Sequence, residues 1–293
     1  MVYKKTIGSV LFDMVNAIVL ILLMIVTLYP FLYVVFSSVS DAKELVAHSG
    51  LLIKPVGFSW AAYEAVIKND MIWLGYRNTL FYVIVGTAFN IIMTSMGAYV
   101  LSRKDFLWKN VLTTMVVITM FFGGGLIPTY LLMQKLGFVN SVWALIIPGA
   151  ISTWNLIIMR TSFSSIPASL EESAKMDGAN DFTILFKIII PLSLPVIAVM
   201  VLYYGVAHWN SWFSAMIYLR KRELYPLQLI LREILVDSRT EGMMTDVSIL
   251  EKQYMSETIK HATIVVSTLP ILCSYPYLQK YFVKGVMIGA LKG

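Results

Sequence analysis

Six windows of this sequence contain no Asp, Glu, Lys or Arg, and they constrain the fold more than any other feature. The shortest window has 19 residues, close to the roughly 20 apolar residues with which a helix crosses the hydrocarbon core of a bilayer. We therefore predict an all-α integral membrane protein with six transmembrane helices. The windows cover residues 14–40, 78–102, 110–134, 136–159, 188–219 and 261–279.

Composition agrees with this class. Of the 293 residues, 58% are hydrophobic and only 14% are charged, which excludes an ordinary soluble domain. The formal net charge of +6 comes from Lys and Arg residues that flank the windows without forming an extended basic stripe, so we predict no nucleic-acid partner. The single cysteine, Cys273, lies in an apolar window, where we expect it to belong to the core.

The distribution of Lys and Arg predicts that both termini are cytoplasmic. In this orientation eleven of the 23 Lys and Arg residues fall inside and twelve outside, but most of the outer ones lie in two long loops, which count less. The first window has 27 residues, too many for the apolar part of a signal peptide, so we expect it to remain as the first span. The triplet Arg220-Lys221-Arg222 beside the fifth span argues against this orientation.

The two outer loops have different predicted roles. Residues 41–77 include a helix expected near residues 60–67, and this loop should cap the outer face of the bundle. Residues 220–260 form either a docking surface for an extracytoplasmic protein or a solvated loop. Their basic triplet could attract an anionic substrate over about 8 to 10 Å.

A mixed-charge island separates the fourth and fifth windows. In a chain this apolar, such a stretch must lie in water at a membrane face. Pro167 suits the first turn of a helix, and Ser169-x-x-Glu172 has the form of a capping box. We predict a helix over residues 167–177 that ends at Gly178. The charged residues of the island are Glu171, Glu172, Lys175, Asp177, Asp181 and Lys187.

This helix is expected to form one arm of an elbow. Asn180 or Asp181 can cap a second helix that leads into the next span. Ala174 and Gly178 lie about one turn apart, so another protein can approach the backbone closely there, and the flanking charges select which surface fits. The other interpretation is an ordinary amphipathic loop between spans.

Interruptions and small residues distinguish two of the inner spans. The second span is rich in Gly, Ala, Ser and Thr, as expected of an inner helix that packs closely. The third is broken by Gly123-Gly124-Gly125 and Pro128, which indicates either a border of a transport pathway or a packing kink. These glycines do not form a phosphate loop, because no G-x-x-x-x-G-K-[ST] or G-x-G-x-x-G occurs, so we expect no ATP site in this chain.

The end of the fifth span carries candidate substrate residues. In YYGVAHWNSWF, aromatic rings lie beside hydrogen-bonding groups, an arrangement that suits a sugar. The alternative is an aromatic belt at the membrane interface, with His208 as a packing residue. No spacing of His, Cys, Asp or Glu suggests a metal site. The candidate residues of the substrate pathway are Tyr204, His208, Asn210 and Trp212.

Five positions of the island match a known signature. Glu172-Ser173-Ala174 is followed by three residues, Gly178, nine residues, Ile188, two residues and Pro191. This pattern resembles the E-A-A-x3-G-x9-I-x-L-P signature of permease subunits of ATP-binding-cassette (ABC) importers, with Ser173 in place of the first Ala and Ile190 in place of the Leu.

The resemblance covers nearly the whole chain. LYPFLYVVFSSVSD, Asn78-Thr79, the island and the QKYFVKGVMIGALKG tail occur in the order typical of maltose-type carbohydrate permeases, as in the six-span partner that ends near Lys-Gly. Within that family, GGGLIPTY and the tail are similar to subunits that import acidic oligosaccharides such as alginate or pectin fragments. A permease for neutral sugars is the alternative.

The resemblance implies a heteromeric importer in the bacterial inner membrane. Its expected partners are a second homologous permease, two ABC ATPase subunits that bind ATP and Mg, an extracytoplasmic sugar-binding protein and the oligosaccharide itself. This chain would be non-catalytic and hold no cofactor. The implied ATPase-coupling residues are Glu171, Glu172, Ser173, Ala174, Asp177, Gly178, Ile188 and Pro191.

The implied domain organisation has three parts. Residues 1–77 form the first span and an outer loop, residues 78–282 the five-helix core with the coupling loop 161–187, and residues 283–293 a cytoplasmic tail that reaches the ATPase. A gradient-driven carrier is a less favoured reading, because carriers place ionisable groups inside spans and only His208 and His261 are candidates here. An embedded enzyme would need paired carboxylates, a metal or an activated nucleophile, which the windows lack.

Overall fold

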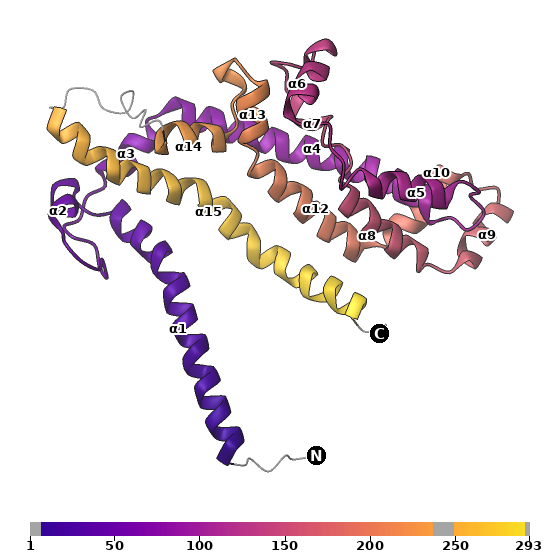
Figure 1. Ribbon diagram of the computed structural model, residues 1–293, viewed down its shortest axis with the longest axis horizontal. Helices are drawn as coiled ribbons and strands as arrows, with labels where there is room; N and C mark the ends of the chain where they lie inside the picture. Colours follow the sequence, from indigo (N-terminus) through magenta and orange to yellow (C-terminus); the bar gives the residue numbers. More distant parts are fainter. Residues whose placement is uncertain (1–6, 237–248, 291–293) are drawn as a thin grey trace. The chain divides into compact units, whose positions relative to one another are not determined.

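The computed structural model describes residues 7–236 and 249–290 (Figure 1). Within this part of the chain every regular element is a helix and no strand occurs. This confirms the all-α prediction. The predicted tail contacts and part of the second outer loop, residues 237–248, lie outside the described residues.

The chain divides into two compact units. The first comprises Met1–Asp70 and Glu233–Leu269, and the second comprises Met71–Arg232 and Pro270–Gly293. One long helix, α15 (Ile249–Ala290), contributes to both units and passes from the first to the second at Pro270.

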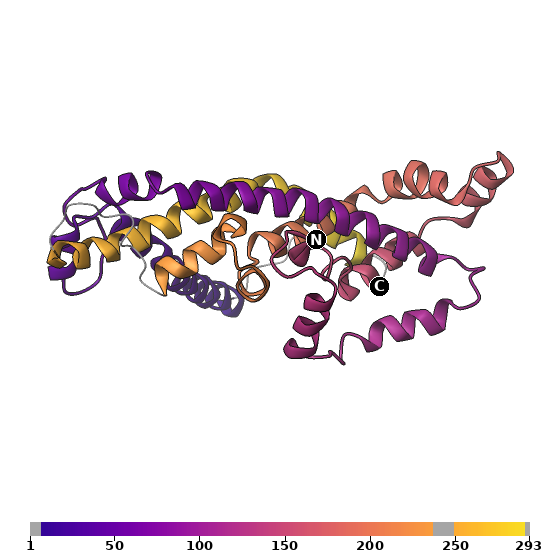
Figure 2. The ribbon, with the colours of Figure 1, turned by 90° about the horizontal axis from the view of Figure 1, so that it is seen from above.

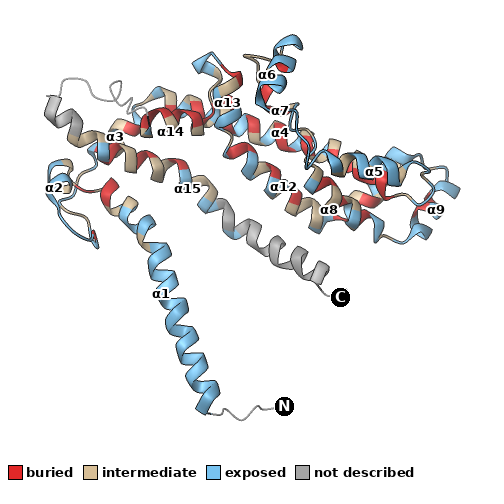
Figure 3. Cartoon of the chain, viewed as in Figure 1, coloured by how far each residue is buried: buried red, intermediate tan, exposed pale blue. Residues whose placement is uncertain are grey.

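The first unit is built on α1 (Ile7–Ser38), which is apolar and exposed along nearly its whole length (Figure 3). Only its end, at Ser37 and Ser38, is buried. There α3 (Ala61–Ile67) packs against it, and the Ser38 and Tyr63 hydroxyls lie 2.8 Å apart. The short helix α2 (Ala42–Ala47) is capped by Asp41. α3 confirms the predicted outer-loop helix near residues 60–67.

The second unit is organised around α4 (Asp70–Ser102), which begins eight residues before the expected span (Figures 1 and 2). Its buried face is small and polar, as predicted for an inner helix. α12 (Leu194–Trp209) and α8 (Thr153–Ser164) pack against this face. α14 (Leu227–Leu235) joins it at Thr79, whose hydroxyl accepts the Leu227 N–H at 2.8 Å. In the second predicted outer loop, residues 220–223 are exposed, whereas α14 is packed against the rest of the unit.

Among the described residues, two helices are long and apolar enough to cross a membrane by themselves, α1 and α4. A third candidate is the bent pair Asp181–Leu192 and Leu194–Trp209, whose axes differ by 89°. α5 (Lys109–Ile118) is apolar but has only 10 residues. The number of six spans stays a prediction.

Two of the expected spans are broken in the structure. The glycine run separates α5 from α6 (Leu126–Lys135), as predicted. The prediction of a continuous fourth span was wrong, because α7 (Trp143–Ile146) and α8 are separated by residues 147–152. Pro148 and Gly149 explain this break: Pro148 has no backbone N–H with which to continue the helical hydrogen bonds, and glycine weakens helix continuation. We call residues 147–152 the span-four break.

The helix predicted to lead from the elbow into the fifth span is present, and it contains a sharp bend. α10 (Asp181–Ile184) continues through a π-helix (Leu185–Ile189) into α11 (Ile190–Leu192), and the bend lies at Ser193 before α12 starts. In the last helix, Cys273 is exposed. Its assignment to the core was wrong, because an apolar window in a helix has an outer face as well as an inner one.

Candidate functional site

The predicted elbow is present as two helices joined by a tight turn. α9 (Ala168–Met176) ends before Gly178, which has φ +80°, a conformation that glycine adopts without strain. The Asn180 side chain accepts the Thr183 N–H at 2.8 Å and so caps α10, as expected. The capping box was wrong: Pro167 occupies the cap position, and Ser169 lies inside the first turn, where its side chain makes no cap bond.

Glu171 anchors the elbow to the end of α4. Its side chain is only 10% exposed and forms an ion pair with the Arg103 guanidinium. The Lys175 ammonium lies 3.2 Å from the same carboxylate, and the Tyr99 hydroxyl donates to it at 3.1 Å. A buried carboxylate needs such partners, because an unpaired charge away from water is costly.

The same cluster extends to the second arm of the elbow. The Tyr99 hydroxyl lies 3.2 Å from an Asp181 carboxylate oxygen, which is 4.0 Å from the Lys175 ammonium. Burial lowers the pKa of the Arg103 guanidinium and nearby groups partly offset this effect, yet arginine remains charged at physiological pH. Three helices, α4, α9 and α10, are thus joined by one network of charges.

The predicted coupling residues divide into two sets. Ala174 is buried in the chain's own core beside Phe163 and Ile184, and Ile188 packs against that core. Glu171 is also turned inward. The outer set consists of Glu172, Ser173, Asp177, Gly178 and Pro191, all exposed. Met176, at 88% exposure, adds a large apolar group to the outer surface of α9.

Sequence reasoning did not identify Arg103 or Tyr99 as part of the elbow. Arg103 directly follows the uncharged window of the second predicted span, and Tyr99 lies inside that window. Their signal was present in their position, since a span that ends at the same membrane face as the elbow can supply partners for its charges.

A second polar network lies deep between α4 and α12. Asn90, with no exposed surface, donates from its amide to the carbonyl oxygens of Gly149 at 2.6 Å and Ala150 at 2.9 Å. Its own oxygen lies 2.6 Å from His208 Nε2, so this nitrogen carries the proton in the bond. Asn90 therefore links α4, α12 and the span-four break.

Tyr204 makes a parallel connection one turn away. Its hydroxyl lies 2.7 Å from the Thr94 hydroxyl and accepts the Ser152 N–H at 2.9 Å. Two of the four predicted sugar residues, Tyr204 and His208, are therefore buried and hydrogen-bonded within the chain.

The other two predicted sugar residues lie beyond the last turn of α12. Asn210 is exposed, and Trp212 is 40% exposed with the Arg232 guanidinium 5.7 Å from its ring centroid. Because α12 ends at Trp209, neither Asn210 nor Trp212 continues the helical face that carries Tyr204 and His208. The structure does not gather the four residues into one cluster.

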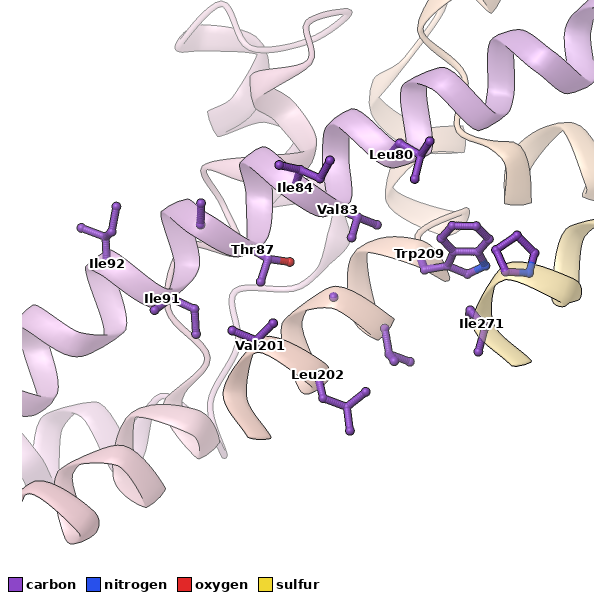
Figure 4. A pocket seen from close by; sticks show the side chains of 14 residues that line it. Leu80, Val83, Ile84, Thr87, Ile91, Ile92, Val201, Leu202, Trp209 and Ile271 are labelled. Atoms are coloured by element: carbon purple, nitrogen blue, oxygen red, sulfur yellow. The ribbon is translucent and has the colours of Figure 1, made fainter. Parts of the chain in front are cut away.

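An apolar groove of about 740 Å³ lies on the other side of α12 (Figure 4). α4 and α12 form its walls, and Pro270 and Ile271 contribute from α15. Only two buried polar atoms here, the Thr87 hydroxyl and the Trp209 ring nitrogen, have no hydrogen-bond partner. Such a lining suits an apolar occupant better than a sugar, which needs many polar partners. In the described part of the chain, no group of three or more His, Cys, Asp or Glu could hold a metal ion.

The absence of a side chain at Gly86 leaves room for the His208 ring. Replacing Gly86 should therefore lower the stability of the protein. A Cβ at Gly86 would lie 2.5 Å from His208 Nε2, and the imidazole cannot withdraw without breaking its bond to Asn90. We expect Gly86→Ala to destabilise the protein by roughly 1–3 kcal/mol, measured by thermal unfolding in detergent. Gly205→Ala is the matched control, because its Cβ would approach the Thr87 hydroxyl no closer than 3.8 Å. Equal losses in both variants would contradict this account.

No protein-family model matches the sequence. Among curated proteins, the chain is 42% identical over 97% of its length to the polygalacturonan/rhamnogalacturonan transport system permease protein YtcP of Bacillus subtilis (strain 168), of which it covers 99%. This chain belongs to the family of ABC transporter permease proteins. The permease is also 38% identical over 96% of its length to Protein LplC of the same organism, covering 95% of it.

A solved structure supports the same assignment for the permease. The model matches a chain in the crystal structure of a bacterial ABC transporter involved in the import of the acidic polysaccharide alginate, with a TM-score of 0.87 and 34% identity. The match covers 96% of this permease and 99% of that chain. Subunits of this family are non-catalytic, multi-pass components of the inner membrane and act with ATPase and substrate-binding proteins. The resemblance seen in the sequence is confirmed.

Proposed function

We propose that this permease forms half of the membrane pathway of an ATP-driven importer for acidic oligosaccharides. The observation that carries the proposal is the 42% identity to a polygalacturonan/rhamnogalacturonan permease over 97% of the chain. Polygalacturonan is a polymer of a uronic acid, and the similar solved structure belongs to a transporter of alginate, described as an acidic polysaccharide. The YtcP relative and the similar solved transporter thus both name cargo that carries carboxylates.

Neutral oligosaccharides are the second candidate cargo. The arabinooligosaccharides transport system permease protein AraQ of Bacillus subtilis (strain 168) is 26% identical over 93% of this chain. This similarity is weaker than that to YtcP, so we favour the acidic class. A gradient-driven carrier is disfavoured by membership of the ABC family.

Uptake measurements distinguish the two cargo classes. In vesicles that contain the whole transporter and its binding protein, we expect ATP-dependent uptake of uronate oligomers and little uptake of neutral oligosaccharides of equal length. The comparison uses labelled oligogalacturonate and arabino-oligosaccharide with the same vesicles. Uptake of the neutral sugar alone would exclude the acidic cargo, while the role as a permease would stand.

The coupling role is proposed for the exposed surface of α9 and its turn. ATP and Mg would bind to two separate ATPase subunits, and closure of those subunits would move the elbow and tilt the spans as rigid bodies. Glu172, Ser173, Asp177 and Gly178 would touch the ATPase, and Met176 would fill an apolar depression. Glu171, Ala174 and Ile188 would act from inside by holding α9 in position, and the exposed Pro191 would belong to the contacting surface.

The proposed topology has six spans with both termini in the cytoplasm. It is supported by the position of Arg103, Arg160 and Lys175 near one end of the helices of the second unit, in line with the positive-inside rule. A second permease would complete the pathway, and the tail, residues 283–293, would reach the ATPase. Labelling of a Lys175→Cys variant from the outside of intact cells would overturn this orientation.

A further inference from the structure

The span-four break is an irregular stretch of backbone that α4 and α12 hold at two points. Asn90 donates to the carbonyls of Gly149 and Ala150, and the Tyr204 hydroxyl accepts the Ser152 N–H. α8 begins directly after the break and leads through Ser165 towards the elbow. α8 therefore connects the break at its N-terminal end with α9, the first helix of the elbow, at its C-terminal end.

The depth of the break follows from the length of α4. Asn90 precedes the end of α4 at Ser102 by 12 residues, which corresponds to about 18 Å at 1.5 Å per residue. Half of a hydrocarbon core is about 15 Å. With Ser102 near the cytoplasmic face, as the proposed topology requires, Asn90 and the break lie close to the middle of the bilayer.

Irregular backbone at this depth is tolerated only where protein covers it or where it lines a water-filled cavity. Pro148, Gly149 and Ile151 are exposed, and a Cβ at Gly149 would meet nothing within 4 Å. Trp154, in the first turn of α8, is 62% exposed. This chain therefore leaves the break open and places an uncovered aromatic ring beside it.

We propose that the span-four break and Trp154 form a sugar-contacting part of the translocation pathway, and that Asn90 and Tyr204 are the residues that position it. The proposal rests on the proposed import of oligosaccharides. Backbone groups at a helix break can bond to sugar hydroxyls, and the ring of Trp154 can stack on the apolar face of a sugar. Asn90 and Tyr204 do not touch the sugar, since their polar atoms are engaged within the chain.

Thiol labelling tests whether sugar reaches the break. Cys273 is the only cysteine, so a Cys273→Ser chain provides a thiol-free background. In the complete transporter, Ile151→Cys should react with a charged, membrane-impermeant methanethiosulfonate, and sugar supplied by the loaded binding protein with ATP should slow that reaction several-fold. The control is Ile84→Cys, because Ile84 is 66% exposed but lies in the apolar groove, where the charged reagent should not react.

A second set of variants tests the positioning residues in the Ile151→Cys background. Tyr204→Phe removes the bond to Ser152, whereas Thr94→Val removes only the bond between Thr94 and Tyr204. We expect protection by sugar to be lost in Tyr204→Phe and in Asn90→Leu, but to persist in Thr94→Val. A role limited to stability would lower the amount of folded protein without changing protection in what remains.

Two results would overturn the proposal. In a transporter that imports sugar, an unreactive thiol at position 151 would mean that another subunit covers the break. A reactive thiol whose rate is indifferent to sugar would mean that the break lies off the pathway. In both cases ATP-driven import would persist, so failure of this inference is distinct from failure of the proposed function.

Discussion

A Gly178→Trp variant is expected to insert into the membrane and assemble normally, while ATP-driven uptake falls by roughly tenfold or more. Gly178 has φ +80°, and a residue with a Cβ loses about 1–2 kcal/mol in that conformation. The indole would also stand on the exposed turn that we assign to the ATPase contact. Among the described residues, no atom beyond the two chain neighbours lies within 4 Å of a Cβ at this position, so the fold itself can accommodate the side chain.

The control is Gly178→Asn. Asparagine tolerates the left-handed conformation better than other residues and is small, so this variant should keep most of the uptake. The measurements are uptake and ATP hydrolysis in the same vesicles, together with the yield of assembled transporter. Wild-type uptake by Gly178→Trp would remove the coupling assignment of the turn, whereas equal loss in both variants would assign the effect to glycine's backbone alone.

The second large effect is expected at the anchor of the elbow. In Arg103→Ala, the Glu171 carboxylate stays buried with Lys175 and Tyr99 as its remaining partners. Removing one member of a buried ion pair typically costs about 3–5 kcal/mol, and the partners that remain should keep the loss near the lower value. We expect a lower thermal unfolding temperature in detergent and weaker coupling of ATP hydrolysis to uptake.

Exchanging the two charges distinguishes the interaction between Arg103 and Glu171 from the separate contribution of each residue. If the two side chains act on each other, Arg103→Glu combined with Glu171→Arg should recover part of the stability that each single change loses. Glu172→Ala is the matched control, because this neighbouring glutamate is exposed and should leave the unfolding temperature unchanged. Additive losses in the double variant would contradict a direct role of the ion pair.

The elbow could be predicted from sequence because its signals are local. Pro167, Gly178 and Asn180 each act on the backbone within a few residues, and the structure has the helix, the turn and the second cap where they indicate. The capping box failed for a local reason too: the helix begins one residue after Pro167, which leaves Ser169 inside it.

The pairing of side chains across helices could not be predicted in this way. Arg103 and Glu171 are distant in the sequence, as are Asn90 and His208, and no spacing rule joins them. Aromatic and polar residues at the end of the fifth span suggested sugar ligands, but the packing of α12 against α4 turned two of them inward. In contrast, Pro148-Gly149 is a local signal for the span-four break. It was overlooked because the two residues lie within an uncharged window that was interpreted as one continuous span.

Adjacent glutamates at the elbow point in opposite directions, Glu171 into the protein and Glu172 into the surroundings. This separation lets selection act on the two positions independently. Under the proposed coupling role, exchanges at Glu172 would adapt the importer to a different ATPase subunit without changing the position of α9. Under the same proposal, a cell with many such importers would use one ATPase for all of them, or a dedicated ATPase for each, through changes at residues that the fold does not need.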